Sequence, residues 1–115
     1  MPQRVYFAKT LRGNVDAGGL CVIRDEAAHA PEERHYQKVT VENETNTAGN
    51  ARIGIEQAGG FVLADYFGAL TVDVPQVSDD SEIVAKPGER LEVRIASATA
   101  ADLIAVNVHG YVWSS

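Results

Sequence analysis

The residues best suited to chemistry in this chain are two histidines and two glutamates in one polar stretch. His29 and His35 flank Glu32 and Glu33. Imidazole and carboxylate groups are common zinc ligands, and zinc gathers three or four of them in a tetrahedron. The glutamates here stand beside Arg34, in a sequence typical of a solvated surface. We therefore expect an exposed loop at this position rather than a metal site.

Three further candidates have residue types that can bind metal or act in catalysis, but the sequence around them lacks the pattern that these functions require. The run 79–82 offers carboxylate and hydroxyl oxygens that calcium accepts, but its spacing matches no calcium-binding loop. His109 has the chemistry of a general base, yet the sequence assigns it no serine, cysteine or carboxylate partner. Cys21 lies within an apolar run, as a buried thiol would. We predict no catalytic, cofactor-binding or metal-binding residues, and hence no enzyme.

Charge and composition argue against several classes of partner. The chain has 115 residues, of which 45% are hydrophobic, and a net charge of −6. Nucleic-acid binding requires clustered lysines and arginines, whereas the ten basic residues are scattered along this sequence. No apolar run approaches the roughly 20 residues of a membrane helix, and no signal peptide is recognisable. We expect one domain over residues 1–115, made in the cytoplasm, with neither nucleic acid nor membrane as a partner.

The elements that must position these residues are β-strands. Charged and apolar residues alternate in Arg90–Ile95, and apolar residues alternate again in Leu103–His109, as in strands with one buried face. The turn-forming residues 86–88 precede the first run, and a short polar stretch separates the two. We therefore predict a closing β-hairpin from Lys86 to Trp113.

Similar alternation recurs along the rest of the chain, and the segments 37–42 and 51–57 are expected to pair as a hairpin. Residues 65–68 and 77–81 are predicted to be loops, and residues 25–36 one long loop or a short helix. About eight short strands indicate an all-β fold, a single-domain antiparallel β-sandwich or jelly roll. Besides the closing pair, the predicted strands are 4–8, 20–24, 37–42, 51–57, 61–63, 70–74 and 82–84.

Several aromatic residues are hard to bury in such a fold. Tyr66 and Phe67 fall in a predicted loop, and Tyr111 and Trp113 lie near the end of the last strand. Aromatic residues are enriched among the anchors of protein interfaces. Together with His109, on the polar side of the last strand, these residues form the predicted partner interface.

The segment from Lys86 to Tyr111 resembles the closing part of small β-sandwich virion proteins of tailed phages. These are capsid decoration (cement) proteins and related head and neck accessories. The shared features are a Pro-Gly-Glu turn, an alternating strand, an Ala-Asp turn, and an apolar strand ending in glycine and an aromatic residue. The resemblance implies a structural virion protein that binds the outer surface of the major capsid protein. It also implies a homotrimer at local threefold positions that resists the pressure of the packaged DNA.

Two alternatives stay open at this point. A ligand-binding or carbohydrate-binding β-sandwich module would use Tyr66, Phe67 or Trp113 as a stacking platform. A small jelly-roll enzyme of the cupin kind would need histidines clustered on facing strands, and only His109 lies in a predicted strand.

Overall fold

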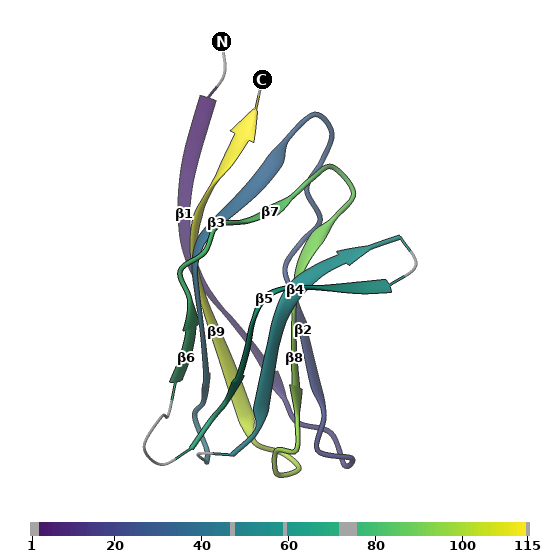
Figure 1. Ribbon diagram of the computed structural model, residues 1–115, viewed down its shortest axis with the longest axis vertical. Helices are drawn as coiled ribbons and strands as arrows, with labels where there is room; N and C mark the ends of the chain where they lie inside the picture. Colours follow the sequence, from purple (N-terminus) through teal and green to yellow (C-terminus); the bar gives the residue numbers. More distant parts are fainter. Residues whose placement is uncertain (1–2, 47, 59, 72–75, 115) are drawn as a thin grey trace.

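The computed structural model describes residues 3–46, 48–58, 60–71 and 76–114, and at residues 63–67 and 79 the backbone alone. Over these ranges the chain contains β-strands and no helix, so the predicted all-β class is confirmed. No helix that is long and apolar enough to cross a membrane occurs in the part described. The strands are β1 (Gln3–Asn14), β2 (Cys21–Arg24), β3 (Glu33–Asn43), β4 (Asn50–Gln57), β5 (Gly60–Ala69), β6 (Gln76–Asp79), β7 (Ile83–Ala85), β8 (Arg90–Ala96) and β9 (Leu103–Ser114) (Figure 1).

These strands form two antiparallel sheets that pack as a β-sandwich. One sheet has the order β1-β9-β3-β6, with β7 also paired to β3, and the other has the order β2-β8-β4-β5. The pairs are nested: β1 with β9, β2 with β8, β3 with β6 and β7, and β4 with β5. A chain that folds once into a long hairpin and then rolls up gives this order, which is that of a jelly roll. The predicted β-sandwich is confirmed.

The first and last strands bring the two ends of the described chain together. β1 and β9 run antiparallel over their whole length, with Gln3 opposite Ser114 and Asn14 opposite Leu103. Figure 1 shows both ends at the same tip of an elongated molecule, which measures 46 × 28 × 20 Å. One end of the β1-β9-β3 sheet therefore carries both termini.

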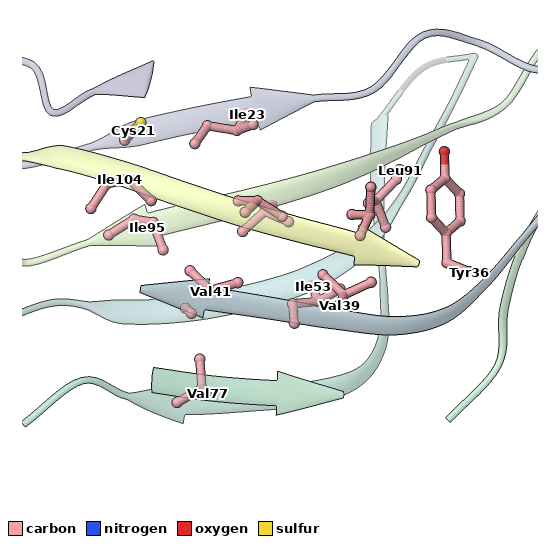
Figure 2. Packing of buried hydrophobic residues seen from close by; sticks show 14 of the residues in the cluster. Cys21, Ile23, Tyr36, Val39, Val41, Ile53, Val77, Leu91, Ile95 and Ile104 are labelled. Atoms are coloured by element: carbon pink, nitrogen blue, oxygen red, sulfur yellow. The ribbon is translucent and has the colours of Figure 1, made fainter. Parts of the chain in front are cut away.

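The core lies between the sheets and is filled by the apolar phase of their strands. Tyr36, Ile53, Leu91 and Ile104 are fully buried, and Figure 2 shows them among the side chains packed between the two layers. Removal of such apolar surface from water is the main stabilising contribution to folding. Cys21 belongs to this cluster, and burial raises the pKa of its thiol. The prediction of a buried cysteine is confirmed.

The predicted closing hairpin is wrong in its pairing. β8 pairs with β2 and β4, whereas β9 pairs with β1 and β3, so the two strands lie in opposite sheets. Residues 97–102 carry the chain from one sheet to the other, with Ser97 and Ala101 at positive φ. The predicted pairing of 37–42 with 51–57 is wrong for the same reason, because β3 and β4 also lie in opposite sheets. Alternation identifies the buried face of a strand but not its hydrogen-bonded neighbours.

Three predicted connections and one predicted strand also differ from the structure. Residues 65–68 belong to β5, where pairing with β4 satisfies their backbone, and residues 77–79 of the second predicted loop belong to β6. Of the predicted strand 70–74, residues 70 and 71 lie outside any strand, and residues 72–74 lie outside the part described. The loop-or-helix segment 25–36 is divided, because β3 begins at Glu33.

The remainder of that segment is irregular and runs beside β8. The backbone amides of Asp25 and Ala28 donate hydrogen bonds to the carbonyls of Leu91 and Glu89, at 3.0 and 2.9 Å. These bonds extend the β2–β8 ladder beyond the end of β2. The backbone groups that a helix would use internally are therefore committed to a neighbouring strand.

A buried carboxylate ties the sheets together at this point. Asp25 is 3% exposed, and it accepts hydrogen bonds of 2.5 Å from both the Lys9 Nζ and the Tyr36 hydroxyl. Arg34 lies 3.6 Å from the same carboxylate. Burial opposes ionisation of Asp25, but the bonds from Lys9, Tyr36 and the backbone outweigh it, so its pKa lies below the ordinary value. Side chains of β1 and β3 thus hold the end of β2, which belongs to the other sheet.

Candidate functional site

An aromatic patch lies on the outer face of the β1-β9-β3 sheet, at the end that carries the termini. In the strand register Arg4 is opposite Trp113, and in the next row Tyr6, Tyr111 and His35 lie side by side. Cross-strand partners point to the same face of a sheet. These five residues from three strands, called the aromatic patch below, therefore form one surface.

Tyr111 is the centre of the aromatic patch. The His35 ring stacks on it, with ring centroids 4.7 Å apart and planes 8° apart, and the Tyr6 ring packs at 5.5 Å. The Arg4 guanidinium lies 4.8 Å from the centroid of the Tyr111 ring and 5.5 Å from that of Trp113. Tyr111 is only 6% exposed, whereas Tyr6 is 64% exposed. Tyr111 is thus a buried support beneath an exposed aromatic and cationic surface.

Two glutamates fix the polar side of the patch. The Nδ1 and Nε2 atoms of His35 lie 3.0 Å from Glu82 and 3.3 Å from Glu33. The Tyr111 hydroxyl donates a hydrogen bond of 3.1 Å to the same Glu82 oxygen. Burial and this bond raise the pKa of Tyr111, so its hydroxyl remains a donor. His35 and Tyr111 are therefore held in place before any partner arrives.

The side chains of the aromatic patch are suited to binding a partner or a ligand. Aromatic faces stack on flat apolar or sugar surfaces, and an arginine held against rings presents a positive charge to carboxylates. Across the described part of the chain, no three His, Cys, Asp or Glu side chains are placed to hold a metal ion. An exposed aromatic centre with a polar margin is typical of protein interfaces.

The structure brings three of the five predicted interface residues onto one face. Tyr111 and Trp113 belong to the aromatic patch, and His109 is exposed in the next row, opposite Ala8 and Lys38. Tyr66 and Phe67 lie on β5 of the other sheet, and their side chains are outside what the structure describes. The five residues therefore do not form a single surface.

The histidine-glutamate cluster is also divided. His29 is exposed and outside any strand, as predicted. The same prediction is wrong for His35 and Glu33, because both belong to β3, and the His35 side chain is only 16% exposed. Pairing with β9 draws this part of the chain into the sheet.

Sequence analysis did not identify Arg4 or Tyr6 as site residues, and it considered His35 only as a metal ligand and placed it in an exposed loop. Near Tyr6 both faces of the first strand carry apolar residues, because Val5 and Phe7 stand on either side of it. The alternation therefore did not indicate which face of this strand points outward. The useful signal was the series Arg4, Tyr6, Ala8, which lies on the outer side of β1. Arg4 and Tyr6 belong to a site only because β1 pairs with β9, which lies at the far end of the sequence.

No protein-family model matches the chain, and comparison with curated proteins finds no match. A proposal for its function therefore rests on the geometry of the molecule and on the resemblance described above.

Proposed function

We propose that this protein is a structural virion protein that binds the outer surface of a phage capsid and stabilises the particle. In this proposal it is a decoration or cement protein, active as a homotrimer, and the major capsid protein is its partner. The observation that supports it is the aromatic patch. Exposed Tyr6 and Arg4 and the partly buried Trp113 are held on one sheet around the buried ring of Tyr111.

The composition of the patch matches that of energetic anchors in protein interfaces. Tyrosine, tryptophan and arginine are enriched among the residues whose truncation costs most binding energy. Because the Tyr6 ring already packs on Tyr111 and the Arg4 guanidinium on the rings of Tyr111 and Trp113, these side chains lose less conformational freedom when a partner covers them. A flat sheet face of this kind suits the broad surface of an assembled shell.

The mechanism of stabilisation would be mass action. A protein that binds only the assembled shell shifts the equilibrium toward assembly. A trimer contacts several capsid subunits at once, so its avidity exceeds the affinity of each contact. The binding surface itself, without any reaction, is then sufficient for function.

The test is binding to particles. Virions purified from the host that carries this gene are first searched for the protein by mass spectrometry. Recombinant protein is then bound to particles from which it has been stripped. We expect Tyr6→Ala to weaken binding about 30-fold, which corresponds to a typical anchor of about 2 kcal/mol. Lys38→Ala, an exposed change on the same face outside the patch, is the control.

Two results would contradict the proposal: absence of the protein from purified virions, or equal binding of Tyr6→Ala and the wild type. The oligomeric state is measured separately by light scattering. Three chains of 12.4 kDa give a trimer of about 37 kDa.

A carbohydrate-binding function is the second candidate, because an exposed tyrosine and a tryptophan beside hydrogen-bonding side chains also suit stacking on sugars. Trp113 is the only tryptophan of the chain, so its fluorescence reports on the patch. A saturable change on titration with capsular or cell-wall glycans, lost in Tyr6→Ala, would favour this function. Binding to stripped particles without any glycan response would favour the capsid.

A further inference from the structure

The outer face of the other sheet is rich in arginine although the chain as a whole is acidic. Strands β2, β4 and β8 carry four arginines and two glutamates, a net charge of +2. Because the whole chain carries −6, the remaining residues carry −8. The strand register places these side chains on the same outward side. This surface, called the arginine face below, comprises Arg24, Arg52, Arg90 and Arg94, together with Glu56 and Glu92.

A buried glutamate organises the arginine face. Glu92 has no exposed surface, although it lies on the outward side, and its two oxygens accept hydrogen bonds of 2.6 Å from Arg24 and Arg94. The Arg94 guanidinium also lies 4.4 Å from the centroid of the Phe61 ring. Both side-chain contacts fix the orientation of Arg94. Its two Nη groups make no hydrogen bond to any residue that the structure describes, so they remain available to an anion.

Next to Arg94 the surface is hollowed. The hollow has a volume of about 290 Å³. It combines two guanidinium groups with exposed aliphatic side chains, because Leu20 and Val22 on the β2 side are each about half exposed. A carboxylate flanked by apolar or backbone atoms matches this combination of charge and apolar surface. The lining residues are Leu20, Val22, Asn50, Arg52, Arg94, Ile95 and Ala96.

We infer that the arginine face binds the acidic surface of a second copy of this chain. The inference rests on the homotrimer of the proposed function and names the surfaces that would form it. The segment between β6 and β7 is the best-matched occupant. Its Asp80 is exposed and has no ion-pair partner among the described residues, whereas the carboxylate of the neighbouring Glu82 is already engaged by His35 and Tyr111.

The charges also select the symmetry of this contact. A twofold axis through the arginine face would place like charges against each other, which is unfavourable. The acidic segment lies at the β3-β7 side of the first sheet, whereas the arginine face belongs to the second sheet. A contact between two different surfaces is head-to-tail, and such contacts form closed rings when the rotation permits. A cyclic trimer satisfies this condition, whereas a face-to-face dimer does not.

The experiment measures the mass of the protein by light scattering at about 0.05 M and about 1 M NaCl, because salt screens such contacts. We expect a trimer at low salt that dissociates at high salt. Arg52→Glu should give a monomer at both salt concentrations, and Lys38→Glu, the same charge change on the opposite sheet, should remain trimeric. Arg94 is left unchanged because the buried Glu92 depends on it.

Two further variants sharpen the result. Val22→Asp places a carboxylate in the hollow, opposite Arg94 in the strand register, where it competes with the incoming acidic segment for that guanidinium. It leaves Arg52 in place, so it tests the site even if Arg52→Glu does not fold; it should also be monomeric. The double variant Arg52→Glu with Asp80→Arg restores an opposite-charge pair and should recover the trimer.

A trimer that persists in folded Arg52→Glu and Val22→Asp would overturn the inference, as would a wild-type protein that is monomeric at low salt. Failure of the double variant to recover the trimer would overturn the choice of the segment between β6 and β7. None of these results depends on particle binding, which the Tyr6→Ala experiment tests on the other sheet. The two proposals can therefore fail separately.

Discussion

At the scale of single residues, Asp25 is a carboxylate that is almost completely buried. Its two oxygens are occupied by Lys9, Tyr36 and a backbone amide, and Arg34 lies close by. Breaking a buried ion pair by removing one partner is strongly destabilising, because the other charge is left without compensation. Asp25 should therefore contribute to stability far more than a carboxylate on which no buried charge depends.

We predict that Asp25→Asn lowers the free energy of unfolding by about 3 kcal/mol, the lower end for a buried pair. The lower end applies because the Lys9 side chain is 32% exposed and reaches water. Urea denaturation followed by circular dichroism measures this value. Glu32→Gln, a carboxylate with no ion pair to any residue in the described part of the chain, is the control and should change stability by less than about 0.5 kcal/mol.

The same carboxylate should make the stability depend on pH. The pKa of Asp25 is lower in the folded protein than its ordinary value of 3.8. Its stabilising contribution is therefore complete above that value and is lost as the pH falls through the lower, folded value. We expect the difference between wild type and Asp25→Asn to shrink on acidification below about pH 4. A difference that stays constant down to pH 2 would show that the charge of Asp25 is not the cause.

At the scale of elements, the pairing of β3 with β9 depends on a glycine. The register shifts between Tyr36 and Lys38, and Gly110 lies opposite Tyr36 at this irregularity. A Cβ on Gly110 would overlap the backbone carbonyl oxygen of His35. Any larger residue must push β3 away from β9, and with it the His35 ring away from Tyr111.

We predict that Gly110→Ala lowers the free energy of unfolding by about 1–3 kcal/mol, as overpacking typically does. It should also weaken particle binding, because the aromatic patch loses its support. Gly18→Ala is the matched control, since a Cβ there meets its nearest neighbour at an ordinary 3.4 Å. Equal unfolding midpoints for the two variants would contradict this role of Gly110.

The elements also show what the sequence can and cannot predict. In β8, alternation correctly predicted that Leu91, Val93 and Ile95 are buried. It also assigned Glu92 to the wet face, yet Glu92 is fully covered, because arginines from two strands close over it. Which strands are neighbours is decided by packing between distant segments, and a local pattern carries no such information.

The candidate site illustrates the same limit. Tyr111 and Trp113 were predicted as interface residues because a strand end rich in aromatics is visible locally. Arg4, Tyr6 and His35 complete the patch only through pairing of the first and third strands with the last. These partners come from opposite ends of the chain, so residue spacing did not reveal them.

At the scale of the whole molecule, the nested order of the strand pairs determines how far apart in sequence the strands are that must meet during folding. β1 and β9 pair across nearly the entire chain, and chains dominated by such distant contacts fold slowly. We predict refolding on the order of milliseconds to seconds, followed by the fluorescence of Trp113, which lies opposite Arg4 in this last pair.

A circular permutant tests the cause of the slow folding. Joining the two termini through a short linker and opening the chain within residues 97–101 makes β9 and β1 neighbours in sequence. Because β8 and β9 do not pair, the opening separates no hydrogen-bonded strands. We expect the permutant to refold faster than the parent and to keep the same circular dichroism spectrum. Slower refolding or loss of the β spectrum would contradict the nested pairing.

The position of the two termini has a practical consequence. Since Gln3 and Ser114 lie opposite each other beside Arg4 and Trp113, a fluorescent label or enzyme fused to either terminus would crowd the surface proposed to meet the shell. The segment 97–101 lies at the other tip of the molecule (Figure 1). A label or enzyme inserted there would point away from that surface. This segment is therefore the better insertion site for displaying a second protein on the particle.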